Sequence, residues 1–144
     1  MPTRIDPRGP QFAAAVTSVV LAAVLVTAPH AIATVLLAVQ TALFALGVGL
    51  GVQRTPHAWA FKRFVRPRLA PPTETEDAGP PRFAQAVGLV FTGIGLLALL
   101  TGLTVVGLVA VGFALAAALL NAVFGLCLGC ELYLTFKRFS PTPG

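Results

Sequence analysis

Charged residues are scarce in this sequence. Asp, Glu, Lys and Arg make up 10% of its 144 residues, whereas 56% of the residues are hydrophobic. A typical soluble domain has about 25% charged residues. The composition therefore argues against a water-soluble fold and predicts a chain whose outer surface faces lipid.

Cysteine and histidine are also rare, with two of each. A structural zinc site needs four ligands, but His30 and His57 lie far along the chain from both cysteines, so we expect no metal site within one chain. The sequence also contains no phosphate-binding glycine loop, nucleophile triad or nucleic-acid-binding module. These absences argue against conventional soluble enzyme chemistry.

The apolar residues are gathered in four runs, at 11–28, 31–52, 83–100 and 104–126, and none contains Asp, Glu, Lys or Arg. A helix of roughly 20 such residues crosses about 30 Å of hydrocarbon and satisfies its own backbone. We therefore predict an all-α integral membrane protein with four transmembrane helices in a single domain, 1–144. The last apolar run continues to Phe136, too far for one perpendicular span, so we expect its end to tilt, kink or enter the interface.

All the basic residues lie outside these runs and would share one side of the membrane. The positive-inside rule then places both termini in the cytoplasm, together with 53–82, an interfacial segment and linker, and the protein in the plasma (inner) membrane. Because the cations flank membrane segments, lipid headgroups are the expected partner of the net charge of +5, and nucleic acid is not. The basic residues are Arg4, Arg8, Arg54, Lys62, Arg63, Arg66, Arg68, Arg82, Lys137 and Arg138.

The two halves of the sequence resemble each other. Residues 6–19 agree with 77–90 at seven of fourteen positions, with an offset of 71, and the Phe-Lys-Arg-Phe of 61–64 recurs at 136–139 with an offset of 75. This pattern predicts two duplicated helical hairpins related by an axis along the membrane normal. A cleaved secretory signal is an alternative interpretation of the first run. The repeat argues against it, because the first run would be the structural equivalent of the third.

The most reactive side chains lie near the end of the last run. Cys127 and Cys130 form a Cys-x-x-Cys pair, and Glu131 follows directly. On a continuous helix the three residues would lie within roughly one 100° sector. One thiolate could then attack while the other resolves a mixed disulfide, with Glu131 managing the proton. Cytoplasmic thiols are normally kept reduced, so a disulfide here would be a turnover state. The alternative is that both cysteines only pack a helix seam.

Three amides lie inside the predicted spans, namely Gln40, Gln85 and Asn121. Such residues are costly in lipid, so they either bond neighbouring helices or mark a small-molecule or quinone pocket. On a continuous helix Asn121 would lie about 120° from Cys127, so a pocket shared by the two residues does not follow. No cofactor other than this quinone is suggested.

Three motifs together resemble a known family. They are the opening Asp6-Pro-Arg-Gly-Pro10, the central Pro-Pro-Arg82-Phe83, and the Gly-Leu-Cys-Leu-Gly-Cys-Glu motif of 125–131. They resemble an uncharacterised four-helix membrane family of actinobacterial type over nearly the whole chain, and the family looks distantly similar to DoxX-like proteins linked to thiosulfate or quinone redox chemistry. Its genes tend to accompany thioredoxin-like and rhodanese-type genes, so the resemblance implies a cytosolic partner of that kind.

Three functions follow as hypotheses. The first is a membrane thiol-redox or sulfur-relay protein, a thiol-disulfide oxidoreductase that uses Cys127, Cys130 and Glu131 on the cytoplasmic side. The second is a non-enzymatic scaffold that docks a cytosolic sulfurtransferase or thioredoxin-like protein through 59–66 and the linker. The third is a small transporter, which would require a homo-oligomer because four helices per chain are few.

Overall fold

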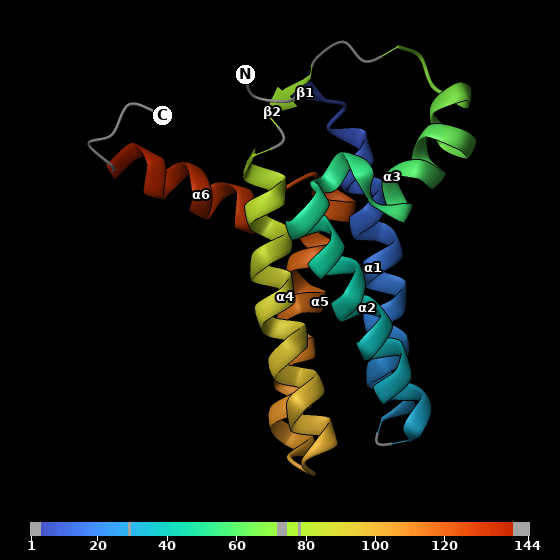
Figure 1. Cartoon of the computed structure of the whole chain (residues 1–144), viewed down its shortest axis with the longest axis vertical. Helices are drawn as coiled ribbons and strands as arrows, with labels where there is room; N and C mark the ends of the chain where they lie inside the picture. The colour runs from blue at the N-terminus through green and yellow to red at the C-terminus, as the bar shows by residue number, and fades with distance from the viewer. Residues whose placement is uncertain (1–3, 29, 72–74, 78, 140–144) are drawn as a thin grey trace.

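Four long helices form an antiparallel bundle in the computed structural model (Figure 1), which describes residues 4–28, 30–71, 75–77 and 79–139. The helices are α1 (Arg8–Thr27), α2 (Ala31–Leu50), α4 (Gly79–Leu100) and α5 (Thr104–Phe124). Each is long and apolar enough to cross a membrane. At about 1.5 Å per residue, roughly 20 residues match the 30 Å of hydrocarbon. The structure thus agrees with the predicted all-α membrane protein.

The helices begin and end within four residues of the predicted runs. The largest differences lie at the starts of α1 and α4, which begin three and four residues earlier than the apolar runs at 11 and 83. Pro10, Pro80 and Pro81 occupy these first turns. A helix tolerates proline there because the first N–H groups have no partner within the helix.

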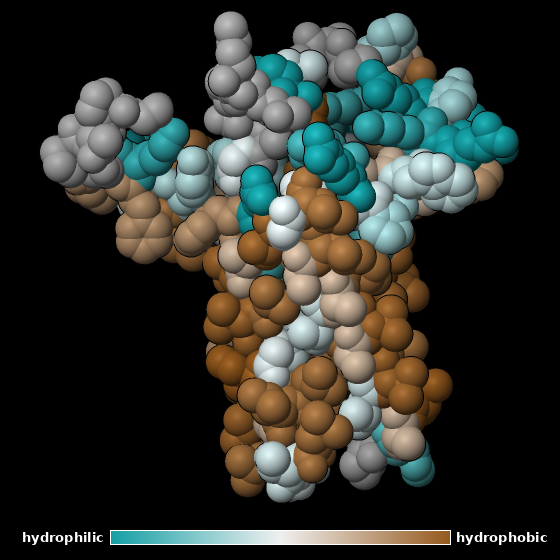
Figure 2. Space-filling model, viewed as in Figure 1, coloured by the Kyte–Doolittle hydropathy of each residue, from teal (hydrophilic) through white to brown (hydrophobic). Residues whose placement is uncertain are grey.

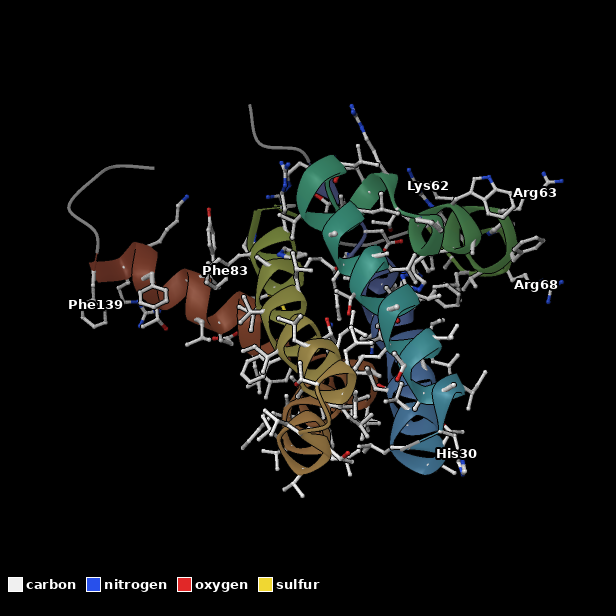
Figure 3. All side chains as sticks on the ribbon, turned by 60° about the horizontal axis from the view of Figure 1, so that its bottom comes forward. His30, Lys62, Arg63, Arg68, Phe83 and Phe139 are labelled. Carbon is white, nitrogen blue, oxygen red and sulfur yellow. A yellow bond between two sulfur atoms is a disulfide. The ribbon has the colours of Figure 1, made fainter. Side chains whose placement is uncertain are left out.

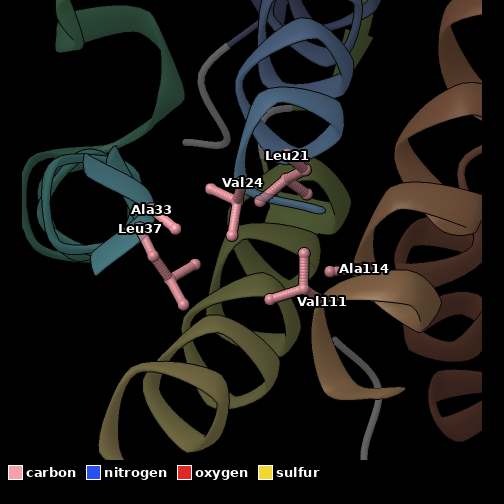
Figure 4. Packing of buried hydrophobic residues seen from close by; sticks show 6 residues of the cluster. All are labelled: Leu21, Val24, Ala33, Leu37, Val111 and Ala114. Carbon is pink, nitrogen blue, oxygen red and sulfur yellow. The ribbon is translucent and has the colours of Figure 1, made fainter. Parts of the chain in front are cut away.

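The four helices surround one small core. Around the bundle the order is α1, α2, α4, α5, because α1 and α4 each pack against both α2 and α5. Small and branched side chains of α1, α2 and α5 form a buried cluster (Figure 4). The fully or nearly buried cluster consists of Leu21, Val24, Ala33, Leu37, Val111 and Ala114.

Most large apolar side chains point outward instead. Val26 is 83% exposed, Val105 74% and Phe113 64%. Figure 2 shows an apolar surface along the long helices, with hydrophilic residues gathered mainly at one end. Exposure of this kind is a liability in water and is ordinary for helices that face lipid.

The polar end of the bundle carries the short elements. After α2 the chain forms η1 (Val52–Arg54), α3 (Pro56–Ala60), a π-helical turn η2 (Phe61–Val65) and η3 (Arg66–Arg68). Strands β1 (Arg4–Ile5) and β2 (Glu76–Asp77) form an antiparallel pair, which the sequence analysis did not predict. After α5 the amphipathic helix α6 (Leu128–Phe139) turns away from the bundle (Figure 1).

The surface segments η2 and α6 each pack on the first long helix of their own half of the chain, which is α1 for η2 and α4 for α6. The Phe61 ring of η2 lies 5.9 Å from the Phe12 ring of α1, measured between centroids. The Phe136 ring of α6 lies 6.4 Å from the Phe83 ring of α4. Aromatic contacts of this length add about 0.5–1.5 kcal/mol beyond area burial. The same kind of contact thus holds both surface segments against the bundle.

Helices α4 and α5 approach closely because glycines face each other at their crossing. A Cβ atom on Gly107 would lie 3.2 Å from the carbonyl oxygen of Gly95, and one on Gly95 would lie 3.1 Å from a methyl group of Val111. Small residues allow such backbone approach where lipid offers no hydrophobic driving force between helices.

This crossing gives a stability test. Replacing Gly107 by leucine should push the two helices apart and lower the free energy of unfolding by about 1 to 3 kcal/mol. Gly112→Leu on the same helix is the matched control, because a Cβ atom there meets nothing within 4 Å. Denaturant titration of both variants in detergent micelles measures the difference. Equal stability of the two variants would contradict the close crossing.

Candidate functional site

The candidate site begins where α5 breaks. Gly125 adopts the left-handed conformation, with φ 68° and ψ 13°, directly after Phe124. Its N–H donates to the carbonyl oxygen of Asn121 at 2.9 Å. A bond of this kind closes the last turn, and glycine takes the left-handed conformation without steric cost. The predicted tilt, kink or interfacial end is therefore a full break of the helix.

Cys127 lies outside both helices, and the continuous helix assumed for Cys127, Cys130 and Glu131 is wrong. The carbonyl oxygen of Cys127 accepts the N–H of Glu131 at 3.0 Å, and its Sγ accepts the N–H of Cys130 at 3.2 Å. The sulfur thus takes the place that a Ser or Asp side chain usually has at the start of a helix. Cys127 caps α6, whereas Cys130 and Glu131 lie in its first turn.

The two cysteines are joined as a disulfide, with their Cα atoms 5.1 Å apart. This separation lies within the usual range for disulfide-bonded residues. Both side chains are half-buried, whereas that of Glu131 is exposed. The cap and first turn of α6 therefore bring the two sulfur atoms together.

Contacts with α4 fix the position of α6. A Cβ atom on Gly129 would lie 2.6 Å from the Cα atom of Ala84, so only glycine permits this approach. The Phe83 ring of α4 lies 5.7 Å from the Tyr133 ring of α6, measured between centroids. These contacts hold the first two turns of α6, and with them the disulfide, against the end of α4.

A cavity of about 310 Å³ lies beneath the disulfide. All four long helices and the start of α6 contribute to its wall, which includes Cys127. The wall is largely apolar, and its aromatic members are Phe44, Phe91 and Phe113. Its polar members apart from Cys127 are Thr17, Gln85 and Asn121. The volume is at the small end of the range for ligand pockets.

The structure brings Asn121 and Cys127 to the same cavity, although a continuous helix would separate them. The turn at Gly125 redirects the chain, and Cys127 then lines the cavity together with Asn121. Gln40 does not line the cavity. It is 1% exposed, and its Nε2 donates to the hydroxyl of Thr17 at 3.4 Å, a bond between α2 and α1.

The comparison with known families bears on nearly the whole chain. A family model described as a domain of unknown function, DUF4395, matches residues 5–138. The chain belongs to the DUF4395 family. No curated protein and no solved structure matches it. The family assignment therefore agrees with the prediction of an uncharacterised family and supplies no activity for the site.

The DUF4395 chain has a second cavity, of about 300 Å³, between the start of α1 and the segment α3–η2. Its wall contains more polar and basic residues than that of the first cavity, and its titratable members are Arg4, Asp6, His57, Lys62 and Arg66. Pro10 and Gln85 line both cavities, so the two cavities are neighbours. Figure 3 shows Lys62 and Arg63 on the surface segment that covers this end of the bundle.

Two groups at the second cavity have shifted pKa values. The pKa of Asp6 is lowered chiefly because its carboxylate accepts hydrogen bonds from the Arg8 guanidinium, at 2.8 Å for the shortest. The pKa of His57 is lowered because burial disfavours the imidazolium form. Neutral histidine and an ionised Asp6 are thus favoured on this wall.

The sequence does not predict the phenylalanine-lined wall of the first cavity, nor does it predict the second cavity. Phe44, Phe91 and Phe113 are spaced as ordinary apolar residues within their runs, and nothing in the sequence distinguishes them from lipid-facing phenylalanines. His57 and Lys62 lie in the predicted interfacial segment and linker, 53–82. Their membership of a cavity depends on how α3 and η2 fold back onto α1.

The contact between Gly129 and Ala84 gives a second test. Gly129→Ala should displace the start of α6 from α4 and expose the cysteines, because the added methyl group would meet the α4 backbone. After reduction, we expect alkylation of Cys127 and Cys130 to be faster by roughly tenfold, since protection of a half-buried group depends on local opening. A time course of alkylation, quenched at intervals and read by mass spectrometry, measures this rate. Gly112→Ala is the control, and a G129A rate equal to the control would refute the role of Gly129.

Proposed function

We propose that this DUF4395 protein is a membrane thiol-disulfide redox protein in which Cys127 and Cys130 cycle between dithiol and disulfide. The observation that carries the proposal is the disulfide at the start of a surface helix, with one sulfur accepting a backbone N–H. That hydrogen bond and the N-terminus of the 12-residue α6 both favour a thiolate in the reduced state. A stabilised thiolate is what exchange with a partner requires.

We place the cysteines on the cytoplasmic side of the plasma membrane, with both termini on that side. The support is the distribution of charge, because the basic residues flank α1, α3 and α6 at one end of the bundle, whereas the turn at Thr101–Gly102 has none. Cytoplasmic thiols are kept reduced, so the disulfide is a turnover state in this proposal.

The proposed partner is a cytosolic thioredoxin-like or rhodanese-type protein. A partner thiolate attacks one sulfur of the disulfide, and its second thiol then releases the mixed disulfide, so two electrons pass to Cys127 and Cys130. A sulfane donor would instead place a persulfide on one cysteine. The other cysteine would displace hydrosulfide as the disulfide closes. Glu131, exposed beside Cys130, is the proposed acceptor of the proton.

We further propose that the bundle is a duplicated hairpin. The support comes from contacts between equivalent positions: Phe12 with Phe61 in one half, and Phe83 with Phe136 in the other. In the strand pair Ile5 lies opposite Glu76, and 76 minus 5 is 71, the offset of the repeat. Pairing of a residue with its own equivalent is what a two-fold axis between the halves requires.

The redox proposal predicts a reversible change in native membranes. Alkylation mass shift should detect two free thiols in growing cells and a disulfide after a thiol oxidant, with full return on reduction. Because thiol-disulfide exchange is reversible, a Cys130→Ser variant should trap the oxidised form of the soluble partner as a mixed disulfide with Cys127, since Cys130 is then absent and cannot release it. Two thiols that never change state would overturn the proposal.

The rival is a scaffold that docks its partner through the exposed Trp59 and Phe64, whose rings meet edge to face at 5.8 Å. It predicts that a double variant, Cys127→Ser with Cys130→Ser, supports the partner pathway as well as the wild type does. Under the redox proposal the same double variant does not support the partner pathway in cells, whereas Trp59→Ala retains thiol-disulfide exchange.

The orientation has its own test. In the Cys127→Ser, Cys130→Ser background, Thr101→Cys should react with a membrane-impermeant maleimide in intact cells, whereas Arg63→Cys should react only after the membrane is opened. The reverse pattern would place the cation-rich end outside and remove the cytosolic partner from the proposal.

A further inference from the structure

The cavity beneath the disulfide has features that suit an electron acceptor. We propose that it binds a membrane quinone, which oxidises the dithiol of Cys127 and Cys130. This inference rests on the proposed redox function and adds the identity of the acceptor. It starts from the position of Cys127, which lines the cavity while its disulfide partner Cys130 does not.

The wall of the cavity fits a flat, apolar ring with polar substituents. Three phenyl rings line it, and the side-chain amides of Gln85 and Asn121 also reach it. Neither amide side chain has a hydrogen-bond partner among the described residues, so both can donate to a ligand carbonyl. A lipid acyl chain would leave these amides unpaired in an apolar wall, which costs free energy, whereas quinone oxygens accept their N–H groups.

The dimensions also fit one ring and little more. Phe113 and Asn121 line the cavity eight residues apart on α5, which corresponds to about 12 Å along the helix. A quinone ring near Asn121 would therefore lie at the Cys127 end, and the first part of its isoprenoid tail would lie at the Phe113 end.

The cavity has a route for a lipid-soluble ligand. Phe91 and Phe113 lie at its wall and are 37% and 64% exposed on the outside of the bundle, with their ring centroids 6.3 Å apart. Leu132 of α6 lines the cavity too and is 48% exposed. The wall between α4 and α5 thus reaches the surface that faces lipid, where membrane quinones are dissolved.

The step balances as a two-electron transfer. The S–S bond forms as Cys127 and Cys130 lose two electrons and two protons. The quinone gains two electrons and two protons and becomes the quinol, whose hydroxyl groups donate to the amide oxygens of Gln85 and Asn121. The soluble dithiol partner then reduces the disulfide again by exchange. The whole cycle carries reducing equivalents from a cytosolic dithiol to the quinone pool.

The test uses the full-length protein in nanodiscs, reduced and freed of reductant. The acceptor is a fully substituted short-chain benzoquinone, which has no open ring carbon for a thiol to add to. Quinol formation is followed by ultraviolet absorbance, and disulfide formation by alkylation mass shift. The Cys127→Ser, Cys130→Ser protein gives the background rate.

Ala117→Phe fills the cavity, because Ala117 lines it. Ala116→Phe is the matched control, since Ala116 is the neighbouring residue on α5 and is exposed to lipid. We expect Ala117→Phe to lower the rate of quinol formation at least about tenfold, since small displacements of reacting groups cost that much or more. Ala116→Phe should stay within about twofold of the wild type, because it is outside the reacting geometry.

Exchange with a soluble thiol-disulfide redox buffer is measured in parallel. Normal exchange shows that a variant is folded and that the proposed redox function holds. If Ala117→Phe fails to fold, Asn121→Leu tests the same cavity, and it should raise the KM for the quinone about tenfold by removing one hydrogen bond.

Exchange without quinone reduction, or an equal loss in the two phenylalanine variants, would overturn the quinone site and leave the redox function standing. Cysteines that neither exchange nor oxidise would overturn both. Quinone reduction that is blocked by Ala117→Phe alone would establish the site.

Discussion

The left-handed turn at Gly125 is the constraint on which the candidate site depends. Without it, α5 would continue as one helix, and Cys127 would lie about 120° around that helix from Asn121. With it, the chain changes direction, Cys127 caps a new helix, and both residues line one cavity. The close contact of Gly129 with Ala84 then fixes α6 against α4. Two glycines thus determine where the sulfur atoms lie, although neither glycine has any chemistry of its own.

Much of the fold could be predicted from the sequence, because lipid imposes strong rules. Apolar runs of about 20 residues without charges can only be helices in a membrane, and their bounds followed hydropathy to within four residues. The excess length after residue 126 also predicted a change of direction there. Hydropathy does not show which residue breaks the helix. Gly125 is one of 14 glycines, and most of the described ones lie inside helices.

The candidate site was less predictable, because hydropathy does not give the path of the chain between two helices. Cys127 and Cys130 were identified by chemical type and spacing, whereas the path of the chain between α5 and α6 decides what surrounds them. A continuous helix would place Asn121 about 120° around the axis from Cys127, so the sequence does not predict that the two residues share a cavity. The second cavity depends on α3 and η2 folding back onto α1, and no local pattern in 53–68 predicts that contact.

The proposed duplication explains why the two cavities exist and why only one suits redox chemistry. Pro10 and Ala13 line the basic cavity, and their equivalents at an offset of 71, Pro81 and Ala84, line the cavity beneath the disulfide. Each cavity therefore lies between the first helix of one half and the surface segment that follows the second helix.

The walls have diverged where the repeat changes residue type. At an offset of 75, Val52 of the basic cavity corresponds to Cys127 of the apolar one. A valine cannot exchange electrons, and the cations near it favour anions over a neutral ring. The proposed duplication would thus account for two similar recesses in the bundle. In this proposal, the substitution of a cysteine for a valine in the second half would give that recess a redox-active wall, while Pro10 and Gln85 line both cavities.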